Sequence, residues 1–501
     1  MAESAPETVS GGMATIAARG SLLNSAQWFA NKLATAGAMF LVARMVSPEE
    51  YGLASQSLAI YQFAVFLAPL TLGDVLIARS DRLACLRESA RVLALKIGLA
   101  MSVVVLAVIP LAVVAYPRYP GAWLAGLIAV LAVRPLIEAT LVVPLSEARI
   151  GFAFRRIALV DGLVQFAATC GTLATAALGG GAASLVAPQV VAVAARARIY
   201  GTKIRSAVDR GASLARQWLL FRAFLPAALA QYAHNVLAML EILVLGFVAT
   251  GAETGLFGLA YTLAAQANTI IAFQLGQVLQ PIFGHLRDDP RRQVLGFIRV
   301  QRALAAVCVP VAVCQAIVAA PLFRLTFPSD WQAAVPTFQV VSLAQAVYFT
   351  SGPTMSCLRA QHRFRFLLWW QSIQLLLSVP LYAVGASAAG AAGVAAASGL
   401  AWALSMLVGM VAVIRGIEPR PLLSAAGVLL QPWLICLPAL LLGQWAVTEL
   451  SALGLLGDVI ATVVAVPALF VMMLQGMRFL NRDIDQAIVA VKKAVVRRRQ
   501  G

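Results

Sequence analysis

The chain has 501 residues, of which 61% are hydrophobic and only 12% are charged. Soluble domains carry about 45–50% apolar and about 25% charged residues, so this composition excludes a soluble fold. Apolar runs of the roughly 20 residues that a bilayer span needs follow one another almost from end to end. The composition therefore predicts an all-α polytopic membrane protein, because a β-barrel would show short alternating segments instead.

Basic residues are unevenly distributed between the loops that join the apolar runs. The net charge of +17 first suggests a nucleic-acid partner, but 33 of the 38 lysines and arginines fall in alternate loops and in the two tails. This distribution follows the positive-inside rule, by which basic loops stay in the cytoplasm. We therefore expect both termini in the cytoplasm and no nucleic-acid partner.

The apolar runs predict about fourteen transmembrane helices, which long basic loops divide into a 6 + 6 + 2 plan. We expect these helices at 20–43, 53–78, 92–115, 121–144, 157–178, 184–202, 219–248, 255–280, 300–322, 334–357, 366–384, 390–413, 424–446 and 454–475. The predicted parts are a cytoplasmic N-terminal segment (1–18), an N-lobe of six helices (19–202), a cytoplasmic linker (203–218), a C-lobe of six helices (219–413), two additional helices (414–475) and a basic cytoplasmic tail (476–501).

A stretch near the start of the chain recurs 203 positions later. At this offset Glu50 aligns with Glu253 and Gly52 with Gly255. The first copy, 47–79, is predicted to be one membrane helix between an outer acidic turn and an inner arginine cluster. Since each half holds an even number of predicted spans, duplication would give a parallel repeat about an axis along the membrane normal.

Ionisable residues at membrane depth are the main candidates for function, because a charge in lipid is costly and usually faces a bundle interior or a watery cavity. Lys32 lies in the middle of the first predicted span, next to Asn31, and offers a positive site for a phosphate or an acidic sugar. Arg134 and Glu138 lie four residues apart in the fourth span and therefore on one face. A structural ion pair that neutralises itself is an equally open interpretation of these two residues.

Carboxylates in the spans are candidates for ion coupling, Glu138 among them. Glu241 in the seventh span qualifies because protonation would remove a costly buried charge. Asp74 lies near the inner end of the second span, where a contact with Arg79 or Arg82 is the favoured interpretation.

Neutral polar side chains of the seventh and eighth spans are candidates for lining a cavity. His234 and Asn235 can hydrogen-bond a sugar, and Gln266 belongs to a polar stripe on the eighth span. A histidine satisfied by a neighbour, and glutamines that link helices by hydrogen bonds, are the alternatives.

No residue pattern indicates covalent chemistry or a bound cofactor. The sequence has no glycine-rich phosphate loop followed by Lys-Ser/Thr, no cysteine or histidine set with metal spacing, and no soluble segment large enough for a separate active site. We therefore expect no catalytic residues, no metal site and no cofactor.

Four short sequences resemble bacterial polysaccharide exporters of the multidrug/oligosaccharidyl-lipid/polysaccharide (MOP) superfamily. They begin at Arg44 (RMVSPEEYGL), Gln280 (QPIFGHLRDD), Pro328 (PSDWQAAVP) and Leu358 (LRAQH). The resemblance implies two six-helix bundles that face each other around a central cavity, as in the multidrug and toxin exporters of this superfamily.

The resemblance also implies a function. The protein would flip an undecaprenyl-diphosphate-linked oligosaccharide across the bacterial inner membrane, for O-antigen, capsule or exopolysaccharide assembly. Lys32 and Arg134 would bind the diphosphate or an acidic sugar while the two lobes rock around the cavity. Membrane lipid, a polysaccharide polymerase and chain-length machinery are the implied partners.

Other functions remain open. A cation-coupled multidrug or toxin exporter of the same superfamily is favoured by Glu138 and Glu241. A lipid II flippase is a further alternative. A membrane-bound glycosyltransferase or polymerase would need a sizeable outer loop, which the sequence does not contain.

Overall fold

The structure is a computed structural model that describes residue 31 and residues 34–151, 153–200, 213–286, 288–361, 363–415 and 417–480. The described residues are mostly helical and contain no β-strand, which confirms the all-α prediction. Among them, seven helices are long and apolar enough to cross a membrane, or up to nine if each of two bent pairs is one span. The protein is therefore a multi-pass membrane protein.

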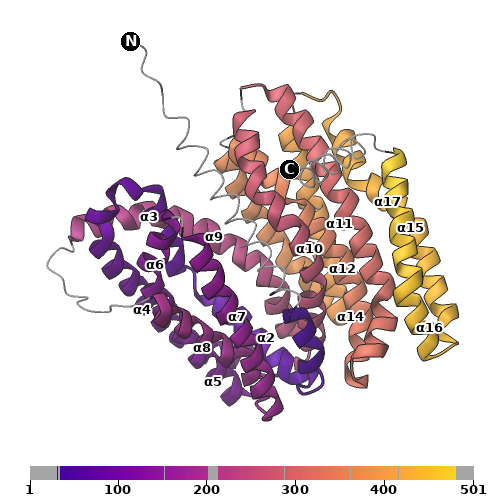
Figure 1. Cartoon of the computed structure of the whole chain (residues 1–501), viewed down its shortest axis with the longest axis horizontal. Coiled ribbons are helices and arrows are strands. Elements are labelled where there is room, and N and C mark those ends of the chain that lie inside the picture. The colour runs from indigo at the N-terminus through magenta and orange to yellow at the C-terminus, as the bar shows by residue number, and fades with distance from the viewer. Residues whose placement is uncertain are drawn as a thin grey trace, which may run out of the picture. The chain divides into compact units, whose positions relative to one another are not determined.

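The first of two compact units comprises Met1–Gly255. Its helices are α2 (Pro48–Ala64), α3 (Leu72–Ala78), α4 (Leu83–Ala115), α5 (Gly121–Ala132), α6 (Arg134–Ile150), α7 (Phe154–Ala177), α8 (Ala183–Tyr200) and α9 (Leu214–Val248). Within this unit α4 packs on α5 and α6, and α7 packs on α8 (Figure 1). Helix α9 packs on α2 and α4, and the first unit extends past the predicted linker 203–218 to Gly255. The predicted division into two lobes stays a prediction.

The second predicted span, 53–78, is bent and not continuous. Its two helices, α2 and α3, meet at 48°. Pro69 has no N–H to donate to the carbonyl of Val65, and it forces the preceding Ala68 toward extended backbone (φ −63°, ψ 118°). The expectation of a single membrane helix over 53–78 is therefore wrong at this proline.

The two copies of the repeated stretch begin with the same helix cap. At the start of α2 the Ser47 backbone N–H donates to a Glu50 carboxylate oxygen at 2.9 Å, and the Glu50 N–H donates back to the Ser47 hydroxyl at 3.3 Å. At the start of α10 Thr250 and Glu253 repeat this reciprocal pair at 3.3 and 3.2 Å. Such a capping box satisfies two orphan donors of a helix start, and its recurrence at an offset of 203 supports the repeat.

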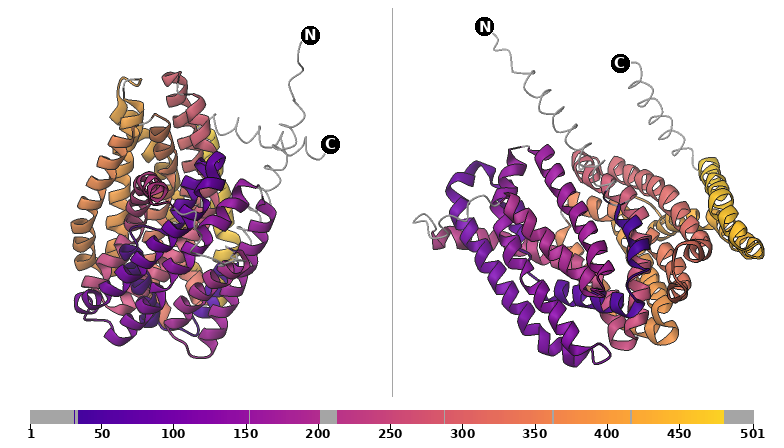
Figure 2. Two further views of the ribbon diagram at one scale, coloured as in Figure 1. Left: turned by 90° about the vertical axis from the view of Figure 1, so that its left-hand side faces the viewer. Right: turned by 60° about the horizontal axis from the view of Figure 1, so that its bottom comes forward.

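The second compact unit comprises Leu256–Gly501. Its elements are α10 (Gly251–His285), whose first turn belongs to the first unit, α11 (Pro290–Thr326), α12 (Val335–Thr350), α13 (Gly352–Ala360), α14 (Phe364–Ile414), α15 (Pro421–Ser451), α16 (Leu455–Ile460), a π-helical turn (Ala461–Ala465) and α17 (Val466–Leu480). In this unit α11 packs on α12, α15 and α17, and α12 packs on α14. Figure 2 shows α15 to α17 along one edge of the unit.

The long helix α14 is a hairpin of two arms. Its backbone breaks at Gly390, where φ is +54°, a left-handed conformation that suits glycine. The arms lie side by side, because the Ser405 hydroxyl donates to Gln374 Oε1 at 2.8 Å and Gly385 contacts Gly393 closely. This break agrees with the two spans predicted at 366–384 and 390–413.

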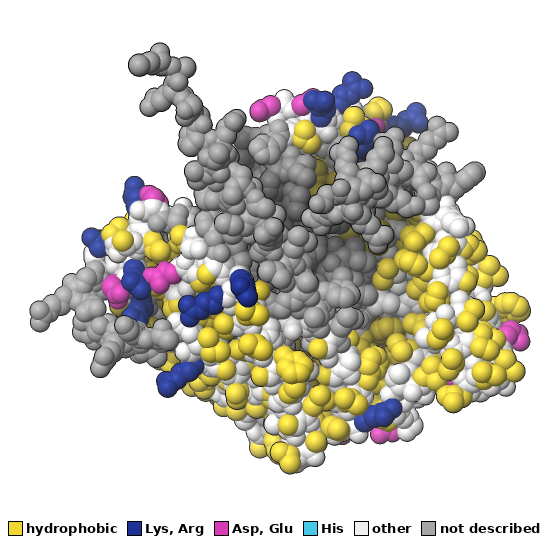
Figure 3. Space-filling model, viewed as in Figure 1, with side chains coloured by type: hydrophobic (Ala, Val, Ile, Leu, Met, Phe, Trp, Pro, Cys, Tyr) yellow, Lys and Arg dark blue, Asp and Glu magenta, His cyan; other side chains and the backbone are white. Residues whose placement is uncertain are grey.

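Large apolar side chains cover much of the visible described surface (Figure 3). Leu111 on α4 is 68% exposed, Leu376 on α14 is 74% exposed and Leu434 on α15 is 66% exposed. In water such extended apolar surfaces would drive association, whereas lipid chains solvate them. The exposed apolar surface is therefore the lipid-facing surface of a membrane protein.

Candidate functional site

A proline break places Arg134 in the middle of a membrane span. The candidate span Gly121–Ile150 has 30 residues, and it divides into α5 and α6 at Val133. Pro135 follows at the start of α6 and has no N–H to donate to the carbonyl of Leu131. At a rise of 1.5 Å per residue, Arg134 lies about 20 Å from the first residue of the span, close to its midpoint.

Gly98 on α4 allows a close approach to this break. A Cβ atom at Gly98 would lie 2.7 Å from the Pro135 carbonyl oxygen and 2.7 Å from the Ala139 Cβ, tighter than real Cβ contacts allow. Any larger residue would push α4 away from α6. The contact therefore holds the break, and with it the depth of Arg134, against a neighbouring helix.

Arg134 forms an ion pair with Glu138 one helical turn further along α6. Its Nε donates to Glu138 Oε1 at 2.7 Å. The Glu138 residue is 8% exposed, whereas the Arg134 side chain is 29% exposed. On its other side the guanidinium carbon lies 5.6 Å from the centre of the Tyr61 ring on α2, a cation–π distance. The guanidinium is thus held between a carboxylate and an aromatic face.

This arrangement leaves the guanidinium with capacity for an anion. Arginine has five N–H donors in a planar fork that fits phosphate, and the bond to Glu138 uses one of them. Glu138 neutralises the charge at rest, so the structure places a paired cation at this depth. The predicted ion pair is present, and the predicted binding role of Arg134 stays a prediction.

The other predicted carboxylates lie on other helices, Asp74 on α3 and Glu241 on α9. Asp74 is 69% exposed by its side chain and pairs with Arg149 Nη1 at 3.5 Å, so the favoured contact with Arg79 or Arg82 is wrong. Arg149 lies in the last turn of the neighbouring helix α6, and the packing of α3 on α6 brings the two residues together. Glu241 on α9 is buried, with 5% exposure.

The predicted polar residues are only partly described. Lys32 and the side chain of His234 lie outside the described residues. Asn31 is half-buried, and Gln231 Nε2 donates to Asn235 Oδ1 at 2.9 Å on α9. Gln266 is half-buried in the second unit, and its Oε1 has no hydrogen-bond partner among the described residues.

Sequence reasoning missed several intramembrane contacts. Tyr61 covers the Arg134 guanidinium, and Gln56 is fully buried on the same helix, in space that Gly246 of α9 leaves free. Asp161 of α7 pairs with Arg196 Nη2 of α8 at 2.8 Å. These residues could have been found in the sequence as polar residues within apolar helices.

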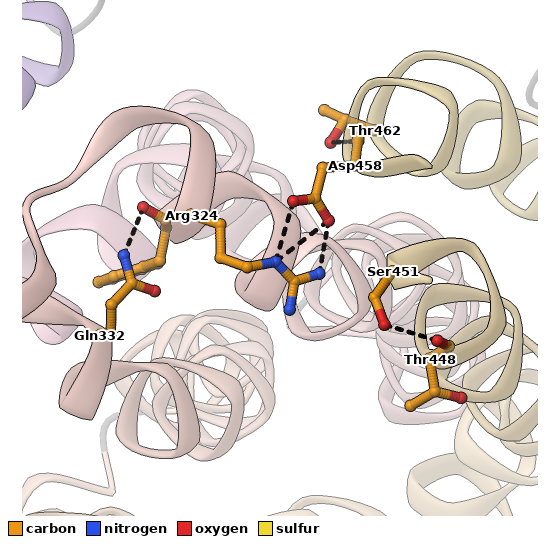
Figure 4. A network of polar contacts seen from close by, with 7 residues as sticks. Arg324, Gln332, Thr448, Ser451, Asp458 and Thr462 are labelled. Carbon is orange, nitrogen blue, oxygen red and sulfur yellow. Dashed lines mark hydrogen bonds and ion pairs between the residues drawn. The ribbon is translucent and has the colours of Figure 1, made fainter. Parts of the chain in front are cut away.

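Another ion pair joins α16 to α11 within the second unit. Arg324 at the end of α11 donates from Nε to Asp458 Oδ2 at 2.9 Å, and Asp458 on α16 is only 6% exposed (Figure 4). Arg324 Nη2 donates to the other carboxylate oxygen, Oδ1, at 2.5 Å, and two parallel hydrogen bonds of this kind are the strong geometry for an arginine–carboxylate pair. The pair therefore fixes α16 to α11 within this unit.

Among the described residues no group of three His, Cys, Asp or Glu side chains is placed to hold a metal ion.

The fold and the intramembrane ion pair define a polytopic α-helical membrane protein with charge buried at membrane depth. The family model described as "Polysaccharide biosynthesis protein" matches residues 41–336, and the chain belongs to this family.

Two curated relatives match over shorter stretches. An "Uncharacterized membrane protein in cps region" of Klebsiella pneumoniae is 22% identical over 127 residues, 25% of this chain and 26% of that protein. The "Lipopolysaccharide biosynthesis protein WzxC" of Escherichia coli (strain K12) is 23% identical over 155 residues, 31% of this chain and 32% of that protein. The matched stretches thus span about a third or less of each relative.

The fold resembles a solved transporter structure over most of its length. "Lipid II flippase MurJ, inward closed conformation" superposes with a TM-score of 0.67 at 13% identity, covering 89% of this chain and 98% of that chain. At this identity the similarity establishes the fold.

Proposed function

We propose that this protein flips an undecaprenyl-diphosphate-linked oligosaccharide across the bacterial inner membrane, for O-antigen, capsule or exopolysaccharide assembly. Membership of the polysaccharide biosynthesis family supports the substrate class. The observation that carries the proposal is the Arg134 guanidinium, held at mid-span and only one turn from its counter-ion. No bond of the substrate breaks, so the protein acts as a transporter and not as an enzyme.

The Arg134–Glu138 pair supports a charge-exchange mechanism. The diphosphate displaces the Glu138 carboxylate from the guanidinium and takes the freed N–H donors, because Arg–phosphate contacts are bidentate and strong. When the oligosaccharide leaves on the other side, Glu138 pairs with Arg134 again, which prevents the cation from retaining the product.

We also propose an orientation in the membrane and a division of the chain into two lobes and two additional helices. Both termini lie in the cytoplasm, as the positive-inside pattern favours. Two lobes, 19–202 and 219–413, alternate in their access to the two leaflets, and the two helices of 414–475 stay fixed to the second lobe. The Arg324–Asp458 contact supports this last point. A polysaccharide polymerase and chain-length machinery would receive the product.

Two other functions have specific support. The carboxylates Glu138 and Glu241, both less than 10% exposed, favour a cation-coupled drug or toxin exporter. The resemblance of the fold to MurJ favours a lipid II flippase.

A gene deletion separates the three functions. Under the proposal, the deletion strain loses surface polysaccharide and accumulates lipid-linked oligosaccharide in the inner leaflet, while growth and drug sensitivity are unchanged. Raised drug sensitivity with intact polysaccharide would favour the exporter. Lysis with accumulated lipid II would favour the lipid II flippase. Either result would overturn the proposal.

A further inference from the structure

The neighbouring ends of α6, α7 and α8 bring three arginines around one carboxylate. We call Arg149, Arg156, Asp161, Arg196 and Tyr200 the α6–α8 cluster. Arg196 Nη2 pairs with Asp161 Oδ2 at 2.8 Å, and the Arg156 guanidinium carbon lies 5.9 Å from the centre of the Tyr200 ring. Arg196, Arg156 and Arg149 each lie within electrostatic range of the Tyr200 phenol. Because Arg149 also pairs with Asp74, the cluster and this carboxylate together carry one net positive charge.

An apolar core beneath the cluster fixes its position. Leu141 and Leu145 of α6, Ile157 of α7 and Tyr200 of α8 are each less than 10% exposed and pack together. The Tyr200 ring is thus anchored in the core. Its hydroxyl end is part of the polar cluster above that core.

Three polar atoms of the cluster are shielded from solvent and have no hydrogen-bond partner among the described residues. They are Asp161 Oδ1, Arg196 Nε and Tyr200 Oη, and the Tyr200 residue is only 6% exposed. Buried polar groups in proteins are nearly always paired, so the two unmet donors, Arg196 Nε and Tyr200 Oη, can serve an acceptor such as an anion. The Arg196 and Tyr200 donors suit one phosphate oxygen each.

The surface below the cluster suits an acyl chain. Of the seven candidate spans, the one on α7 is the least covered by protein, since only 11% of its apolar window is buried. Leu159, Leu163 and Phe166 are 56, 68 and 57% exposed, and their spacing places them on one helical face. An apolar face that leads away from a cationic cluster matches the two parts of a phospholipid.

We propose that the α6–α8 cluster binds the phosphate of an anionic membrane phospholipid, whose acyl chain lies along the exposed face of α7. Arg149 and Arg156 attract the headgroup from the exposed rim, since their side chains remain accessible. Arg196 and Tyr200 donate to the phosphate, and Asp161 holds the Arg196 guanidinium in place. This site does not depend on the identity of the transported substrate.

Lipid binding to the purified full-length protein tests this site. Native mass spectrometry and the unfolding midpoint are measured with phosphatidylglycerol, phosphatidylcholine or inorganic phosphate added. We expect phosphatidylglycerol alone to bind and to raise the midpoint. Equal effects of phosphatidylcholine would contradict the role of charge. Full saturation by inorganic phosphate, with no gain from phosphatidylglycerol, would contradict a lipid as the source.

Matched variants test the residues. Tyr200→Phe removes only the phenolic O–H and keeps the ring in its core, and we expect about tenfold weaker phosphatidylglycerol binding, as for loss of a hydrogen bond to a charged group. Arg196→Gln should weaken it further. Arg155→Gln removes an exposed charge next to the cluster and should leave binding within about twofold, the range of a screened surface charge. Wild-type binding by Tyr200→Phe and Arg196→Gln would overturn the proposal.

Discussion

Gly52 on α2 and Gly255 in the first turn of α10 occupy equivalent positions of the 203-residue repeat and lie against each other. A Cβ atom on either glycine would lie 2.9 Å from the backbone nitrogen of the other. The same Cβ atoms would clash with the carbonyl oxygens of Gly251 and Pro48, which are themselves equivalent positions. The contact is therefore reciprocal between equivalent positions of the repeat.

The first prediction concerns the contact between these two glycines. Gly52→Ala forces α2 away from the backbone of α10, and overpacking of this kind costs about 1–3 kcal/mol. We expect a lower unfolding midpoint and reduced polysaccharide export, and the same result for Gly255→Ala. Gly126→Ala on α5 is the control, because no atom lies within 4 Å of the added Cβ. Wild-type stability and export in both Gly52→Ala and Gly255→Ala would show that the close contact is dispensable.

The second prediction concerns Arg134. Arg134→Ala removes the anion site and leaves the Glu138 carboxylate buried without its partner, so we expect export to be lost. Arg134→Lys keeps the charge without the planar fork and should retain partial export. Surface polysaccharide is quantified at equal protein levels in the membrane. Full export by Arg134→Ala would eliminate the proposed role of this cation.

The third prediction separates charge exchange from a structural ion pair. Glu138→Gln removes the competing carboxylate charge and leaves Arg134 free for the anion. We expect this variant to bind the lipid-linked oligosaccharide more tightly and to release it more slowly in reconstituted vesicles, at an unchanged unfolding midpoint. If the pair is structural, Glu138→Gln would instead lower the unfolding midpoint and leave substrate affinity unchanged.

The fourth prediction concerns Arg324 and Asp458. Removing Arg324 leaves a carboxylate that is 6% exposed without its partner, which is more harmful than removing both charges. We expect the Arg324→Ala variant to unfold at a lower temperature than the Arg324→Ala/Asp458→Ala double variant. A double-mutant cycle measures the coupling between them. Strictly additive effects would mean that the pair does not hold α16 to α11.

The sequence predicts contacts along a helix better than contacts between helices. Arg134 and Glu138 were placed on one face by their spacing, and they do pair. The partners of Asp74 and Asp161 lie on neighbouring helices, and spacing along one helix does not reveal which helix is the neighbour. Composition predicted the all-α membrane fold, because lipid solvation imposes the same requirement on every span.

The proline in the second span could have predicted its bend, but the continuous apolar run favoured one straight helix. Pro69 lies within a continuous apolar run, and such a run is compatible with a straight helix and with a broken one. The backbone of Ala68 and Pro69 determines the break. The close contact of Gly52 with Gly255 was likewise not predicted, although their alignment in the repeat was, since the alignment carries no information on distance.

The fifth prediction concerns orientation. The positive-inside pattern predicts that 179–181, Thr250 and Pro328 lie on the periplasmic side. Reporter fusions at Gly180, Thr250 and Pro328 should therefore all read as periplasmic. A cytoplasmic signal from any one of them would contradict the proposed topology.

The most direct test of the proposed function is the flipping rate of a fluorescent undecaprenyl-diphosphate-linked oligosaccharide in vesicles that contain the purified protein. Bleaching of the outer leaflet by a membrane-impermeant reductant measures this rate. We predict that the wild-type protein accelerates flipping well above protein-free vesicles and that Arg134→Ala does not. No acceleration by the wild-type protein, or equal acceleration by Arg134→Ala, would contradict the proposed mechanism.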